Sequence, residues 1–131
     1  MPMHAAEFYT LTQNVGLEIK DVAMLTLVPE AKLKLWLAGD DPVPDGVAGL
    51  VCDIDREIAA RLARAVSKAA DREDVILIRF RNPLHFKKAG PDMAPIPPML
   101  AYKCHCALIN RLYTAFVQAG KTVSVRYWQP D

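Results

Sequence analysis

Three consecutive residues, Cys104-His105-Cys106, combine the side-chain types that bind zinc and that form thiol nucleophiles. Each residue of a helix turns the chain by about 100°, so in a helix the two thiols would point about 200° apart. They could not close on one metal ion, and the imidazole between them would point away from both. We therefore expect buried structural thiols around a core histidine whose hydrogen bonds are satisfied, with no metal ion and no cofactor.

A second candidate for chemistry is Asp53-Ile54-Asp55, which follows the apolar residues Leu50-Val51-Cys52. Some phosphoryl-transfer enzymes present a nucleophile and an acid in this way, but they also need later carboxylates to hold magnesium. The later strand expected here ends in Arg79 and Arg81 instead. A helix N-cap at Asp53, followed by an acidic first turn, explains the same residues.

A third candidate is a group of basic and aromatic residues expected near the carboxyl end of a strand over 74–81 and near the ends of the neighbouring elements. In open sheets with crossover helices, ligands bind beyond the carboxyl ends of parallel strands. An anionic partner would suit this place, although a solvated strand end whose arginines pair with acidic residues is the alternative. The group, called the basic rim below, comprises Arg79, Arg81, His85, Phe86, Lys87, Lys88, Lys103, Arg126 and Trp128.

The distribution of charge along the chain also draws attention to the basic rim, because the rim lies in the basic part of the sequence. The chain has 131 residues and a net charge of +1, but residues 1–75 carry 8 Lys/Arg against 13 Asp/Glu, whereas residues 76–131 carry 8 against 2. The two parts therefore have net charges of −5 and +6. The halves could pair with each other in one fold, or the basic half could face a partner.

The elements that must position these residues follow from periodicity and turn signals. Leu33, Leu35 and Leu37 alternate with polar or bulky neighbours, as in a strand with one buried face. Val75–Ile78 is a continuous apolar run, typical of an interior strand. We expect strands over 7–12, 17–28, 32–37, 74–81 and 122–128, helices over 54–70 and 99–119, and a loop over 39–49.

This order, β-β-β-α-β-α-β, predicts an α+β fold with α/β character. We expect a single domain, 1–131, built on a mixed five-stranded sheet with two helices packed on it, in which strands four and five are parallel neighbours. Residues 82–98 contain five prolines and form a long Pro-rich loop in this scheme. So long an irregular segment is often functional.

Three features bear on the expected cellular location: the number of cysteines, the first nine residues and the lengths of the apolar runs. The odd number of cysteines argues against a disulfide-stapled secreted domain. Residues 1–9 do not resemble a signal peptide, and no apolar run approaches the ~18 residues of a membrane span. We expect a soluble cytoplasmic protein that does not contact a membrane.

These observations favour a non-enzymatic binding module whose basic rim and Pro-rich loop contact an acidic protein partner or a second copy of the chain. One alternative is nucleic-acid binding through the same rim, with Phe86 or Trp128 stacking on bases. Another is a small enzyme that uses Cys104 or Asp53 as its nucleophile.

Overall fold

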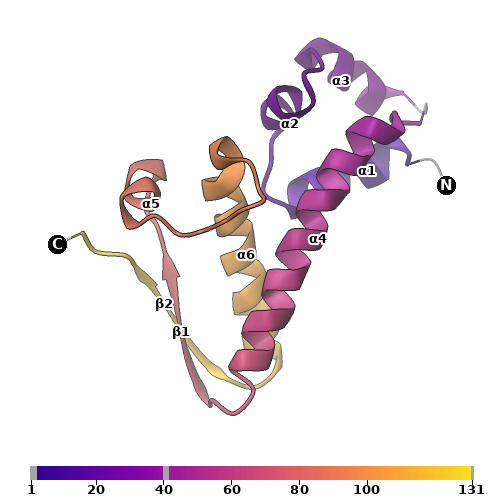
Figure 1. Cartoon of the computed structure of the whole chain (residues 1–131). Coiled ribbons are helices and arrows are strands. Elements are labelled where there is room, and N and C mark those ends of the chain that lie inside the picture. The colour runs from indigo at the N-terminus through magenta and orange to yellow at the C-terminus, as the bar shows by residue number, and fades with distance from the viewer. Residues whose placement is uncertain (1–2, 40–41, 131) are drawn as a thin grey trace. The chain divides into compact units, whose positions relative to one another are not determined.

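The computed structural model describes residues 3–39 and 42–130, and contacts divide the chain into two compact units on either side of the Glu57–Ile58 bond. The first unit holds three short helices and the beginning of a long one, and the second holds the rest of that helix, two strands and two more helices (Figure 1). The elements are α1 (Ala5–Asn14), α2 (Ile19–Thr26), α3 (Glu30–Ala38), α4 (Asp45–Lys68), β1 (Asp74–Arg79), α5 (Pro83–Ala89), α6 (Pro98–Gln118) and β2 (Thr122–Tyr127).

The expected five-stranded sheet is wrong, because the three strands predicted in the first forty residues are the helices α1, α2 and α3. The alternating leucines in 32–37 wrongly indicated a strand, because in so short a segment their spacing fits both the two-residue period of a strand and the 3.6-residue period of a helix. Leu33 is fully buried, but Leu35, which a strand would place beside it, is 72% exposed. Trp36 and Leu37, three and four residues after Leu33, are partly buried, as the helical period requires.

Local signals start and stop these helices. Glu18 and Asp21 form a capping box at the start of α2, in which the backbone N–H of Glu18 donates to Asp21 Oδ2 at 2.8 Å. Leu27, with a φ of 59°, ends α2 in the left-handed conformation. Pro29 then opens α3, where a missing N–H has no cost.

The long helix α4 begins earlier than expected. It starts at Asp45 and ends at Lys68, so Asp53 lies in its interior and is not the N-cap. Asp53 instead accepts a hydrogen bond from Arg56 at 3.0 Å on the exposed side of the helix. Of the loop expected over 39–49, residues 45–49 belong to α4, and residues 40 and 41 lie outside the described part of the chain.

The second unit contains a parallel pair of strands packed on α6. β1 and β2 are hydrogen-bonded neighbours from Asp74↔Thr122 to Arg79↔Tyr127, which confirms the expected parallel pairing of the last two strands. Within the described residues they form a sheet of two strands only. Helix α6 crosses from one to the other and buries Leu100, Cys104, Leu112 and Phe116.

The proline-rich connection is partly helical. Pro83–Ala89 forms α5, capped by Asn82, whose side chain accepts a hydrogen bond from the backbone N–H of His85 at 2.8 Å. Residues 90–97 form the remaining loop. Arg61 of α4 holds this loop by donating to the carbonyls of Asp92 and Ala94 at 2.9 and 2.8 Å.

None of the helices described is both long and apolar enough to cross a membrane.

Candidate functional site

The first candidate surface is the helix pair α2–α3. A connection of three residues, 27–29, joins the two helices, and α2 is viewed close to its axis beside α3 in Figure 1. Val22 of α2 and Leu33 of α3 are both fully buried, so the pair shares a core within the first unit. Two short helices joined by so tight a turn have the connectivity of a helix-turn-helix.

The outer side of α3 is exposed along its whole length. Lys32 and Lys34 point into solvent, and the ammonium group of Lys32 lies 5.6 Å from the centre of the Trp36 ring. Lys34 forms an exposed ion pair with Glu30 at 3.3 Å, which contributes little stability. Leu35 is also exposed. Because Lys32 and Lys34 point about 200° apart on the helix, the exposed cationic and apolar side chains are spread around α3 and do not form one face.

The second candidate surface is built on an aromatic cluster in the second unit. Phe80, directly after β1, is its centre, with ring centroids 5.4 Å from Phe86, 5.2 Å from His105 and 5.8 Å from Trp128. His85 packs on Trp128 at 5.7 Å. The cluster thus joins the end of β1, helix α5, helix α6 and the residue after β2.

The histidines of this cluster are short of polar partners. The buried Nδ1 atoms of His85 and His105 have no hydrogen-bond partner among the described residues. Burial, together with the nearby Arg79 and Arg61 charges, lowers the pKa of His105 to about 4. His105 is therefore a neutral packing group at pH 7, but its partly exposed ring and its Nδ1 atom, unpartnered within the described part of the chain, differ from the satisfied core histidine expected from the sequence.

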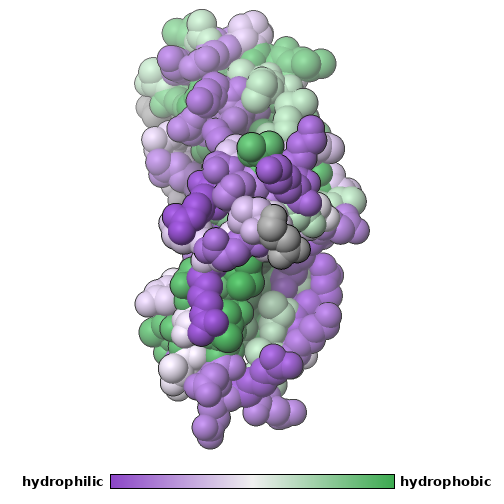
Figure 2. All heavy atoms as spheres, turned by 90° about the vertical axis from the view of Figure 1, so that its left-hand side faces the viewer, coloured by the Kyte–Doolittle hydropathy of each residue, from purple (hydrophilic) through white to green (hydrophobic). Residues whose placement is uncertain are grey.

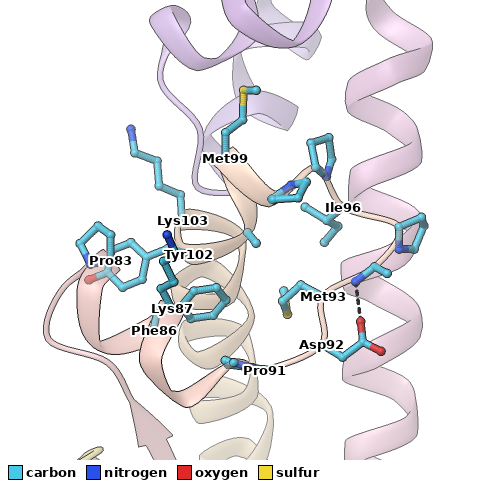
Figure 3. Close-up of a pocket in the computed structure, with 16 residues that line it drawn as sticks. Pro83, Phe86, Lys87, Pro91, Asp92, Met93, Ile96, Met99, Tyr102 and Lys103 are labelled. Atoms are coloured by element: carbon cyan, nitrogen blue, oxygen red, sulfur yellow. Dashed lines mark hydrogen bonds between the residues drawn. The ribbon is translucent and has the colours of Figure 1, made fainter. Parts of the chain in front are cut away.

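Next to the aromatic cluster lies an open apolar pocket of about 890 Å³ (Figure 3). Its walls come from α5, the 90–97 loop and the first turns of α6. Its lining is mostly apolar and includes Phe86, Met93, Ile96 and Tyr102 together with five prolines, while Lys103 extends outward from the edge of the pocket. Burial raises the pKa of Tyr102 above its usual value, and its hydroxyl donates to the Phe80 carbonyl at 3.3 Å.

The structure separates the charged members of the basic rim. Arg79 turns toward α6 and donates to Asn110 Oδ1 at 2.8 Å, so its partner is an amide. Arg81 stacks on Tyr127 at 4.1 Å. Lys87 and Lys103 line the apolar pocket, whereas the exposed Lys88 ends α5 and the exposed Arg126 lies on β2.

The aromatic members of the rim behave differently, because His85, Phe86 and Trp128 pack together in the aromatic cluster. Met93 and Ile96 belong to the Pro-rich loop that the sequence singled out as a contact surface, whereas sequence reasoning did not place His105 and Tyr102 in the same region. The apolar, proline-rich stretch before α6 was the available signal for the pocket.

The thiols form no recognisable catalytic or metal centre. Cys104 is fully buried, Cys52 and Cys106 are partly buried, and none of the three forms a disulfide bond. Across residues 3–39 and 42–130, no three His, Cys, Asp or Glu side chains are grouped to hold a metal ion.

No known protein family matches the chain, and no characterised protein has significant sequence similarity to it.

Proposed function

We propose that this chain is a non-enzymatic binding protein that docks α3 into the major groove of double-stranded DNA. The observation that carries this proposal is the helix-turn-helix connectivity of α2 and α3. In proteins that use this motif, the second helix enters the groove while the first crosses the phosphate backbone.

The side chains on α3 suit that role. A major groove about 12 Å wide admits one helix with its side chains. Lys32 and Lys34 point about 200° apart on α3, so in the groove they would donate to phosphate oxygens on its two sides. The exposed Leu35 suits the methyl group of thymine. Lys34 would exchange its weak pairing with Glu30 for these contacts.

The surrounding charge predicts how such binding depends on salt. Residues 1–57 carry 4 Lys/Arg against 10 Asp/Glu, a net charge of −6. Few phosphates can then be neutralised from this unit, so the affinity should fall only gently with salt. Specificity would come from base contacts of α3 more than from general attraction to the backbone.

The experiment is selection of binding sequences from a random duplex library with the full chain, followed by fluorescence anisotropy on the selected duplex. The variant pair Lys32→Glu/Lys34→Glu should abolish binding. The matched pair Lys87→Glu/Lys88→Glu removes the same charge from α5 and should leave binding unchanged. If only the Lys87→Glu/Lys88→Glu pair loses binding, nucleic acid binds at the basic rim and not at α3. If the selection yields no bound duplex, the proposal is refuted.

A second candidate function is binding of an acidic protein partner at the apolar pocket. The specific observation is the open apolar wall between α5 and α6, with Lys87 and Lys103 at its edge. Such a lining fits an extended segment with one large apolar side chain beside a carboxylate. A Tyr102→Ala variant should weaken capture of that partner, and unchanged capture would count against this function.

The alternative of a small enzyme is not favoured by the position of either proposed nucleophile. Cys104 is buried in α6, and Asp53 is exposed on α4 in contact with Arg56.

A further inference from the structure

We infer that two copies of this chain associate through the free edge of β1, forming one continuous four-stranded sheet by antiparallel pairing of β1 with β1 of the second copy. The inference is independent of DNA binding. It uses only residues of the second unit.

The two-stranded parallel sheet is incomplete as it stands. Parallel sheets are normally covered on both faces, and two strands alone are marginally stable. Helix α6 covers one face, on which Leu77 is buried. On the opposite face Ile76 and Ile78 are 54% and 42% exposed, and Figure 2 shows hydrophobic surface with hydrophilic residues around it on this side of the strands.

The backbone of β1 has one set of polar groups directed to β2 and one directed away from it. The carbonyls of Glu73 and Arg79 accept hydrogen bonds from the N–H groups of Thr122 and Trp128 at 2.9 and 2.8 Å. Alternate residues of a strand direct their N–H and C=O to opposite edges. Ile76 and Ile78 therefore direct their backbone groups to the outer edge, where no strand pairs with them among the described residues.

The charges along β1 select a second copy of this same strand as the occupant. Glu73 and Asp74 stand at the start of β1, and the exposed Arg81, which stacks on Tyr127, lies two residues beyond its end. Arg79 is already bonded to Asn110 and is not counted in this match. Antiparallel pairing of two identical strands about a two-fold axis brings the acidic start of one opposite the basic end of the other. With Leu77 on the axis, and with the ladder continued one residue before β1 and two residues after it, Glu73 would face the partner's Arg81.

The same register also pairs the exposed apolar groups. Ile76 of each copy lies opposite Ile78 of the other, on the face that α6 leaves open. These isoleucines direct their free N–H and C=O groups at each other, so they form the hydrogen-bonded pairs of the new ladder.

The other strand does not offer such a match. β2 is preceded by Lys121 and carries Arg126, with no acidic residue between them. If β1 paired with β2 of another copy, the growing sheet would keep a free strand at each end, and further copies would add without forming a closed assembly. Pairing of β1 with itself closes after two copies.

The experiment measures the molar mass of the full chain by sedimentation equilibrium across the micromolar range. We expect about twice the 14.5 kDa of one chain. Glu73→Arg and Arg81→Glu should each raise the dimer dissociation constant by about tenfold or more, because each places like charges opposite each other twice. The double variant Glu73→Arg/Arg81→Glu restores opposite charges and should restore the dimer.

Two further variants separate this contact from others. Ile78→Pro removes one outward N–H without touching the hydrogen bonds to β2, so it should give a folded monomer by circular dichroism. Arg126→Glu changes a charge on the other strand and should leave the dimer intact. A chain that is monomeric at every concentration, or a dimer that survives Ile78→Pro and both single charge reversals, would overturn the inference.

Discussion

Acidification from pH 7 to pH 5 should destabilise the folded chain through His105. The imidazole packs between Phe80 and Phe86, with Arg79 and Arg61 as the nearby charges that act on it. Burial and these cations lower its pKa from 6.5 to about 4. Between these values the unfolded chain binds a proton that the folded chain excludes, so the free energy of unfolding falls as pH falls from about 6.5 toward about 4.

The size of the effect follows from the two pKa values. A pKa of about 4 in the folded chain against 6.5 in the unfolded chain corresponds to about 2 kcal/mol lost between pH 7 and pH 5. Because His105 is only partly buried, water screens its charge and reduces the expected loss to about 1–2 kcal/mol.

Urea unfolding of the wild type and of His105→Phe at both pH values provides the assay. The phenylalanine keeps the ring packing but does not titrate, whereas the carboxylates titrate equally in both proteins. The wild type should therefore lose about 1–2 kcal/mol more than the variant on acidification. Equal losses in the two proteins would refute the reasoning.

Three other predictions concern the two units separately. Leu33→Ala should lower the free energy of unfolding by about 2–5 kcal/mol in thermal or urea melts, whereas Leu35→Ala on the exposed side of α3 should change it by less than about 0.5 kcal/mol. Lys121→Met should cost about 1–3 kcal/mol in the same melts, because the ammonium group donates to three backbone carbonyls after α4. In a thiol-reagent titration Cys104 should react only after unfolding, whereas Cys106 should react in the native chain.

Part of the fold follows from local sequence signals. The apolar run 75–78 predicted β1, and the proline pair before α6 together with Gly120 after it predicted that helix to within one residue at each end. The parallel pairing of β1 with β2 also followed, because a helical crossover between two strands leaves few alternatives.

The first forty residues could not be assigned in the same way. Short segments rich in leucine, valine and threonine satisfy the strand period and the helix period almost equally well. Burial distinguishes the two: Phe8 and Thr12, four residues apart, are both buried, and Leu35 is exposed beside a buried Leu33. Only the packing of α1, α2 and α3 on one another decides which period applies, and with it whether the chain has a helix-turn-helix.

For the candidate surfaces too, the sequence located residues but did not determine how their side chains are arranged. Sequence alone singled out the basic and aromatic residues around 79–88 and predicted buried thiols in α6 around a satisfied core histidine. Cys104 is buried, but Cys106 is only partly buried and the Nδ1 atom of His105 has no hydrogen-bond partner within residues 3–39 and 42–130. The sequence did not show that Arg79 bonds to Asn110 while Arg81 stacks on Tyr127, because a side chain's direction depends on distant neighbours. The free edge of β1 is likewise visible only in three dimensions, since hydrogen-bonding partners of a strand are set by which segments lie beside it and not by its own residues.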